Sequence, residues 1–205
     1  MSEQTQATVD ELDPDEIEVE DTDPDEEEHL DPEEAARRAA ALSHVRKFGD
    51  PVLRTKARPV QRFDEALREE VERMGELMND AIGVGLAATQ LGVLHRVLVY
   101  RAQQQAPVAA LVNPELEWSG SELETAEEGC LSLPAVHVEV ERPLNVRVKA
   151  QNEHGEPITI EASGLEARVI QHEMDHLDGV LILDRTSRAE RKQAMKALRA
   201  ALGDD

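Results

Sequence analysis

Residues 172 to 176 read His-Glu-Met-Asp-His, and this spacing places both histidines on one side of a chain only if the segment is helical. Four residues advance an α-helix by about 40° and 6 Å, so His172 and His176 project from one face and can bind a single ion. Glu173 lies between them, where it can take a proton from a water on that ion. Two ligands do not complete a catalytic site, so the pattern predicts a third from elsewhere.

Three positions in the sequence are candidates for the source of that third ligand. A metzincin has a histidine three positions after the glycine that ends the run, but this chain has Ile182 there. A thermolysin-like site needs a later acidic ligand, and Glu190 is the formal candidate, although its spacing from Ser187 is typical of a helix cap. The single cysteine, Cys130, would complete a set of one thiolate and two imidazoles that leaves a fourth position open for water.

A third segment, Gly83 to Gln90, is small, flexible and apolar. Its Gly-x-Gly lets a ligand approach the backbone, but alone it is a weak signal, because no lysine or third glycine follows to suit a phosphate loop. In order, Gly-Val-Gly-Leu-Ala-Ala-Thr-Gln, Glu-Gly-Cys-Leu-Ser and Gln-His-Glu-Met-Asp-His-Leu resemble the three signature motifs of peptide deformylases. The resemblance runs from about Val45 to Arg199. It implies a hydrolase that removes the formyl group from N-formylmethionine at the N-terminus of newly made proteins and releases formate.

This resemblance implies that Cys130, His172 and His176 hold one divalent metal ion. Thiolate and imidazole ligands suit Fe, Zn, Ni or Co, so the donor set alone does not identify the metal. The resemblance favours Fe(II).

The remaining motif residues take catalytic roles by the same resemblance. Glu173 would accept the proton of the attacking water and return it to the leaving amine. The side-chain amide of Gln90 and the backbone N–H of Leu131 would stabilise the oxyanion that forms on the formyl group.

Substrate contacts are also implied. Backbone groups around Val84, Gly85 and Gly129 would pair with an extended peptide as an added strand does, which makes binding tolerant of sequence. An apolar pocket near Leu165 and Val169 would take the methionine side chain.

Glu128 and Arg142 match by position a pair that supports the metal site in peptide deformylases. Two residues depart from the pattern of the family. His137 stands where many members place a substrate-contacting arginine, with a solvent-facing strand residue as the alternative reading, and Arg168 occupies a helix position that is often apolar beside the methionine pocket.

The net charge of −22 is concentrated at the N-terminus. Residues 1–36 hold 17 acidic residues and no lysine or arginine, which leaves 27 acids and 22 bases, or −5, for residues 37–205. Low hydrophobicity, high charge and three Asp-Pro pairs predict a disordered tail over 1–36, although an Ala-rich helix could already begin at Pro32 and run to Leu42. Residues 37–205 are predicted to form a single catalytic domain.

The domain is predicted to be α+β, with antiparallel sheets packed around a central metal-binding helix and a helix near each end. Apolar residues at helical spacing predict a helix from Asp64 to Asp80. Ser163 with Glu166 and Ser187 with Glu190 predict capping boxes for helices that end near Gly179 and Leu202. The predicted strands are 95–101, 108–112, 136–140, 145–151 and 157–161, with a hairpin turn at 152–156.

The cysteine count and the distribution of apolar residues predict the cellular compartment of the protein. One cysteine excludes an intramolecular disulfide, and no apolar stretch suits a membrane span or signal peptide, so we expect a cytoplasmic protein that binds neither membrane nor DNA. The last predicted helix carries a mostly basic surface. It could be a solvated terminal helix, or it could dock the enzyme on ribosomal RNA, as the resemblance implies for a C-terminal helix.

Two other classes remain as alternatives. A general metallopeptidase or amidase would use the same ion and the same Glu173. A non-catalytic zinc module would need neither that glutamate nor an oxyanion donor, and structural zinc sites usually fill all four positions with protein ligands.

Overall fold

We describe the fold from a computed structural model of the chain, in which residues 30–103 and 106–202 are described. The α-helices of these residues are α1 (Pro32–His44), α2 (Glu65–Asp80), α3 (Gly164–Leu177) and α4 (Arg188–Leu202). The strands are β1 (Gly85–Ala87), β2 (Val97–Tyr100), β3 (Ala109–Ser119), β4 (Leu123–Cys130), β5 (Leu133–Pro143), β6 (Asn145–Gln151) and β7 (Pro157–Ser163). Short 3-10 helices occupy Pro51–Arg54, Ala88–Leu91 and Ile182–Asp184.

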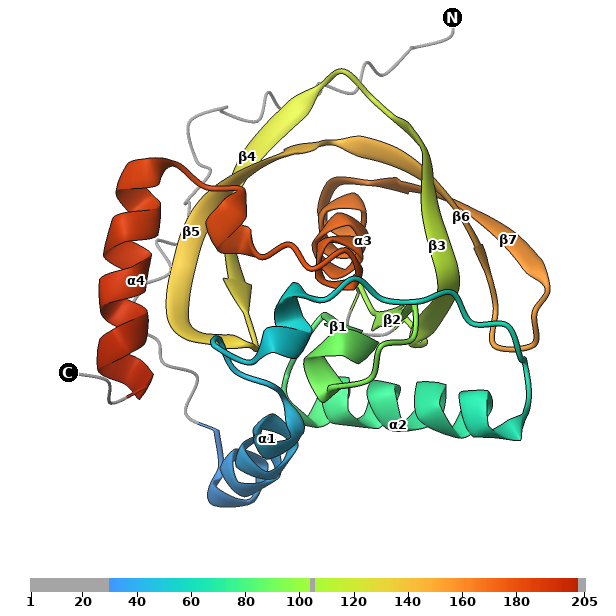
Figure 1. Cartoon of the computed structure of the whole chain (residues 1–205), viewed down its shortest axis with the longest axis horizontal. Coiled ribbons are helices and arrows are strands. Elements are labelled where there is room, and N and C mark those ends of the chain that lie inside the picture. Colours follow the sequence, from blue (N-terminus) through green and yellow to red (C-terminus); the bar gives the residue numbers. More distant parts are fainter. Residues whose placement is uncertain (1–29, 104–105, 203–205) are drawn as a thin grey trace, which may run out of the picture.

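Two antiparallel sheets surround α3. One contains β1, β2, β3, β6 and β7 in that order, and the other pairs β4 with β5. Because β3 leads into β4 and β5 leads into β6 after short connections, the two sheets form a bent surface that curves around α3 (Figure 1). The predicted α+β class, with a central helix, an N-terminal helix and a C-terminal helix, is confirmed.

Strand β2 is buried on both faces, which explains why its sequence is continuously apolar. Successive side chains of a strand point to opposite faces. Leu98 therefore packs in one apolar cluster with Ile170 of α3, while Val97 packs in another with Met78 of α2. Strand β2 thus packs α3 against one face of the larger sheet and α2 against the other.

The elements largely follow the predicted ones. The helix from Asp64 to Asp80 is confirmed as α2 with its N-terminal cap, and all five predicted strands are present in part or in full. Strands β3 and β5 extend well beyond the predicted segments, and β1 and β4 were not predicted. Helix α1 begins at Pro32, so its first residues fall within the predicted tail of 1–36. Residues 1–29 of that tail lie outside the described residues.

The two predicted capping boxes differ in outcome. Ser163 precedes α3 but its side chain makes no cap hydrogen bond, and Glu166 instead accepts a hydrogen bond from the Tyr100 hydroxyl at 3.0 Å. That capping box is wrong, because a partner from β2 engages the carboxylate. Before α4 half of the capping box is present, since the backbone N–H of Glu190 donates to Ser187 Oγ at 3.2 Å, while the Glu190 carboxylate accepts from the Ser187 hydroxyl at 3.1 Å.

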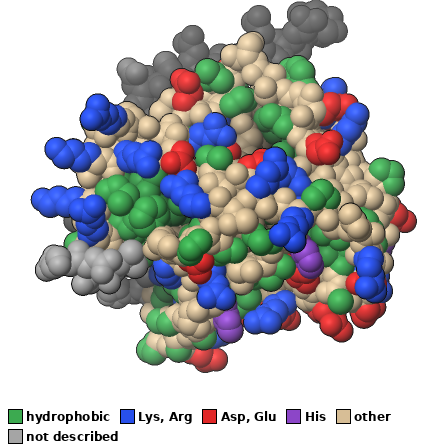
Figure 2. All heavy atoms as spheres, viewed as in Figure 1, with side chains coloured by type: hydrophobic (Ala, Val, Ile, Leu, Met, Phe, Trp, Pro, Cys, Tyr) green, Lys and Arg blue, Asp and Glu red, His purple; other side chains and the backbone are tan. Residues whose placement is uncertain are grey.

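Helix α4 packs on β5 by its apolar side and exposes its basic side. Ala194 and Leu198 are buried in the apolar cluster that includes β5. The exposed basic residues are Arg188, Arg191, Lys192, Lys196 and Arg199. Figure 2, in the same view as Figure 1, shows Lys and Arg side chains gathered at the left of the molecule, where α4 lies.

Candidate metal centre and substrate cavity

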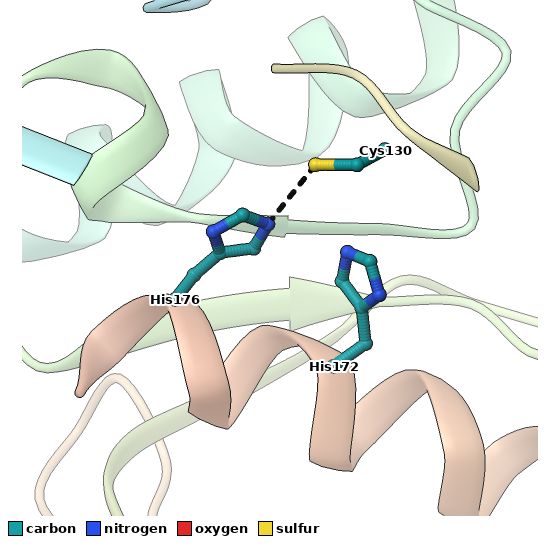
Figure 3. Close-up of side chains that lie close together, drawn as sticks. All are labelled: Cys130, His172 and His176. Carbon is teal, nitrogen blue, oxygen red and sulfur yellow. Dashed lines mark hydrogen bonds between the residues drawn. The ribbon is translucent and has the colours of Figure 1, made fainter. Parts of the chain in front are cut away.

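The predicted ligands come together where the end of β4 meets α3. His172 and His176 lie one turn apart on α3, and Cys130 is the last residue of β4 (Figure 3). Cys130 Sγ lies 3.2 Å from His176 Nε2, and the ligand atoms of all three side chains lie within 4.8 Å of one another. One ion could contact all three atoms, because its bonds to nitrogen and sulfur are about 2.0–2.3 Å long.

The electrostatics of these side chains favour the forms that bind a metal. Burial would raise the pKa of the Cys130 thiol, but His176 and His172 hold this pKa well below its ordinary value, and the thiolate is the form that binds metals. His172 Nδ1 lies 3.0 Å from Glu128 Oε2, which leaves its Nε2 for an ion. The residues present therefore fit a single divalent ion.

Glu128 is a buried carboxylate with four hydrogen-bonding atoms of other side chains around it. Arg142 donates to it at 2.7 and 2.9 Å, Arg168 donates at 2.8 Å, and His172 lies at 3.0 Å. Burial would raise the pKa of Glu128, but the hydrogen bonds from His172 and Arg142 lower it to about 2. Arg142 also donates to Asp175 of α3 at 2.8 Å. The expected pairing of Glu128 with Arg142 is present and orients His172 from behind.

The two departures from the family pattern differ in their surroundings. Arg168 borders the cavity described below, but its guanidinium is directed at protein partners. It donates to Glu128, to the carbonyl of Val140 at 2.8 Å and to the carbonyl of Glu124 at 2.7 Å. It therefore does not place a free charge in the cavity. His137 is exposed on β5 and also borders the cavity.

Glu173 is buried on the α3 face beside the ligands, at 4% exposure, and its Oε2 has no hydrogen-bond partner among the described residues. Burial raises the pKa of Glu173, and the neighbouring histidines oppose that rise. Gly85 lies directly against this side chain, since a Cβ added there would be 2.4 Å from Glu173 Oε1. The Gly-x-Gly segment thus makes room for the carboxylate, a role that the sequence did not indicate.

The Gln90 amide is held close to Cys130. Its Oε1 accepts a hydrogen bond from the backbone N–H of Ala87 at 2.9 Å, which fixes the amide plane. Its Nε2 lies 3.2 Å from Ser132 Oγ and 3.8 Å from Cys130 Sγ. Gln90 and Leu131 both line the cavity beside the ligands.

A cavity of about 470 Å³ opens next to these groups. All five residues that were predicted to contact the substrate line it, namely Val84, Gly85, Gly129, Leu165 and Val169. Val84 and Leu165 are about half exposed, at 51% and 56%, whereas Val169 is buried at 5%. The first two therefore form an apolar rim and Val169 an inner wall.

Sequence reasoning missed several residues that line the same cavity, among them Arg38, Leu42, Lys47, Ile82 and Ala135. Lys47 donates from Nζ to the carbonyl of Leu131 at 2.9 Å. Ile82 and Ala135 have φ of 58° and 57°, a conformation that non-glycine residues rarely adopt and that often occurs at functional sites. No local pattern marks these positions, because they reach the cavity only through tertiary packing.

Comparisons with known proteins point in one direction. The family model described as Polypeptide deformylase matches residues 42–192. The peptide deformylase of Thermotoga maritima is 51% identical over 157 residues, which cover 77% of this chain and 94% of that protein. The peptide deformylase of Parafrankia sp. is 48% identical over 161 residues, which cover 78% of this chain and 87% of that protein.

Solved structures agree with these relatives. The crystal structure of peptide deformylase from Thermotoga maritima matches with a TM-score of 0.68 and 50% identity, covering 70% of this chain and 96% of that one. The crystal structure of a peptide deformylase from Legionella pneumophila matches with a TM-score of 0.74 and 38% identity, covering 78% and 94%.

Proposed function

Because the chain belongs to the polypeptide deformylase family, we propose that Cys130, His172 and His176 hold one divalent metal ion for the reaction of that family. The reaction is hydrolysis of the formyl amide at the N-terminus of newly made proteins, which releases formate and a free N-terminal methionine. The observation that carries the site assignment is the buried Glu173 Oε2, which has no hydrogen-bond partner within residues 30–103 and 106–202, beside a cysteine and two histidines.

The proton in this mechanism is moved by Glu173. A divalent ion in the site would lower the pKa of a coordinated water and polarise the formyl oxygen. Glu173 accepts the proton of the attacking water at its free carboxylate oxygen and then delivers it to the leaving amine. Its burial supports this role, because a raised pKa keeps a carboxylate closer to the operating pH.

The negative charge that develops on the formyl oxygen needs hydrogen-bond donors. The Gln90 amide supplies one, since its oxygen is tied to the backbone and its nitrogen faces Cys130. The backbone N–H of Leu131, the residue after Cys130, supplies the other. One such donor is worth about 3 kcal/mol in transition-state stabilisation.

The cavity binds the formylated peptide. Val169 and Leu165 contact the methionine side chain, and the backbone of Val84, Gly85 and Gly129 hydrogen bonds to the extended main chain. Main-chain recognition suits an enzyme whose substrates share only their first residue.

Two variants test the assignment. Glu173→Ala should retain a full equivalent of metal yet release formate from a formyl-methionyl tripeptide at least about 100-fold more slowly, because it removes the proton carrier and no ligand. Cys130→Ala should lose metal. Metal content and formate release are measured on the same samples, and a Cys130→Ala protein that keeps tightly held metal would remove Cys130 from the ligand set.

We propose Fe(II) as the native ion, with Zn, Ni or Co as the ions it must be compared with. The thiolate and imidazole donors support any of them, and the resemblance to the family favours iron. Protein prepared without oxygen and reconstituted with each metal separately should be most active with Fe(II). Higher turnover with zinc than with iron would overturn this assignment.

We also propose that the enzyme is cytoplasmic and reaches its nascent substrates by docking on the ribosome through α4. The exposed basic residues of α4 support contact with RNA phosphates, which should weaken steeply with salt. Arg191 is paired with Asp184, so Lys192 and Lys196, one turn apart and exposed, make the sharper test. Lys192→Glu with Lys196→Glu should reduce co-sedimentation with ribosomes at low salt and leave tripeptide hydrolysis unchanged. Equal co-sedimentation of the parent and the variant would contradict docking through α4 and would leave packing on β5 as the role of this helix.

Among residues 30–103 and 106–202, no helix combines the length and the apolar character that are needed to span a bilayer.

A further inference from the structure

Helix α1 contributes to the substrate cavity although most of it precedes the residues that match the family model. That match begins at residue 42, and α1 begins at Pro32. Arg38 and Leu42 nevertheless line the same cavity as Cys130 and Glu173. The two α1 residues are four positions apart and therefore lie on one face of the helix.

Helix α1 is capped at its first turn and is anchored to the body at its C-terminal end. Asp31 caps the first turn by accepting hydrogen bonds from the backbone N–H groups of Glu33 and Glu34, both at 2.9 Å. At the other end, Ala41 and Val45 are buried, and the backbone N–H of Arg46 donates to the carbonyl of Gln90 at 2.7 Å. The second contact ties the end of α1 to the segment that holds the Gln90 amide.

Arg38 is the cavity-lining residue of α1 that carries charge. Its side chain is exposed and makes no hydrogen bond or ion pair with the described residues. By contrast Arg168, which also lines the cavity, is buried and donates its hydrogen bonds to Glu128 and to two backbone carbonyls. Lys47 adds a second cation to the cavity, and the exposed Glu127 of β4 adds an acid.

We propose that Arg38 forms an anion-binding subsite at the open edge of the substrate cavity, which takes an acidic side chain from the residues that follow formylmethionine. The inference rests on the proposed function, because it assumes that the peptide leaves the cavity past its rim. A guanidinium suits this role, since its planar donors pair with a carboxylate in two parallel hydrogen bonds. Because Arg38 is exposed, the gain in substrate affinity is limited to what a solvated ion pair supplies.

The test uses three pairs of formyl-methionyl tetrapeptides, each pair differing only by Asp or Asn at the second, third or fourth residue. Formate release gives kcat/KM for the parent, Arg38→Ala, Arg38→Lys and Arg38→Glu. The parent should prefer the Asp peptide by about two- to fivefold in at least one pair at low salt, and high salt should reduce the preference. Arg38→Ala should remove the preference, Arg38→Glu should reverse it, and Arg38→Lys should retain part of it.

Arg37→Ala is the matched control, because Arg37 is the neighbouring charge on α1 and does not line the cavity. It should keep the Asp preference of the parent. An Asp-to-Asn ratio that is the same in the parent and Arg38→Ala in all three pairs would overturn the subsite, and so would an equal effect of Arg37→Ala. Failure of the parent to hydrolyse the Asn peptides would instead count against the proposed function.

Discussion

Gly85→Ala tests how closely the carboxylate of Glu173 is held in place by the backbone of β1. A Cβ at residue 85 would lie 2.4 Å from Glu173 Oε1, 2.8 Å from its Cγ and 2.9 Å from its Cδ, where ordinary contact begins at 3.4 Å. The carboxylate must therefore move by about 1.0 Å (3.4 − 2.4) or force an equal shift of β1. A displacement of about 1 Å can cost about 100-fold in rate, which corresponds to about 2.7 kcal/mol in the activation free energy.

We expect kcat for a formyl-methionyl tripeptide to fall by about this factor in Gly85→Ala while metal content stays at one equivalent, because no ligand is touched. Gly75→Ala is the control. Its Cβ would meet Val108 at an ordinary 3.4 Å in the middle of α2, so it should leave kcat unchanged and stabilise the protein by about 0.5–1 kcal/mol. A Gly85→Ala enzyme that keeps its metal and more than about a third of the parent kcat would refute the reasoning.

Three further predictions concern stability and the tail. Arg142→Met leaves the buried carboxylates of Glu128 and Asp175 without their shared partner. The free energy of unfolding should therefore fall by about 3–5 kcal/mol, and the Tm by about 6–20 °C in thermal unfolding. A decrease of less than about 1 kcal/mol in the free energy of unfolding would contradict the importance of this network. Burial would raise the pKa of Asp184, but the hydrogen bonds from Arg54 and from the backbone N–H of Leu181, together with the charges of Arg54 and Arg191, lower it from 3.8. The stabilisation by Asp184 is therefore complete above pH 3.8 and is lost as the pH falls through the lower folded value, so the Tm values of the parent and Asp184→Asn should converge in acid. Deleting residues 1–29 should leave tripeptide turnover within about twofold, because the segment precedes α1; a larger drop in kcat would show that it contacts the body.

The parts of the fold and site that sequence could predict are those with a local physical origin. The helical spacing of His172 and His176 and the periodicity of α2 depend on neighbours within a few turns, so both were predictable. Placing Cys130 beside the histidines needed the motif resemblance, because nothing local joins the end of β4 to α3.

The parts that could not be predicted depend on long-range partners. Strand β4 was missed because Glu124, Glu127 and Glu128 break any apolar alternation, and burial of Glu128 is stabilised by arginines from β5 and α3. The capping box at Ser163 failed for the same reason, since Tyr100 of β2 engages Glu166. The contribution of α1 to the cavity depends entirely on how that helix docks.

The proposed metal ligands lie beside two separate apolar clusters. Cys130 packs against the cluster of β5 and α4, whereas α3 belongs to the cluster inside the larger sheet. An ion between them would fasten the two halves of the domain together, and its binding free energy would add to their docking. Hydrolytic competence thus becomes a property of the fully assembled domain. A molecule in which the β4–β5 hairpin has separated from α3 would lack the thiolate of Cys130 as a ligand and would not hydrolyse the substrate. Partly folded molecules would therefore be inactive.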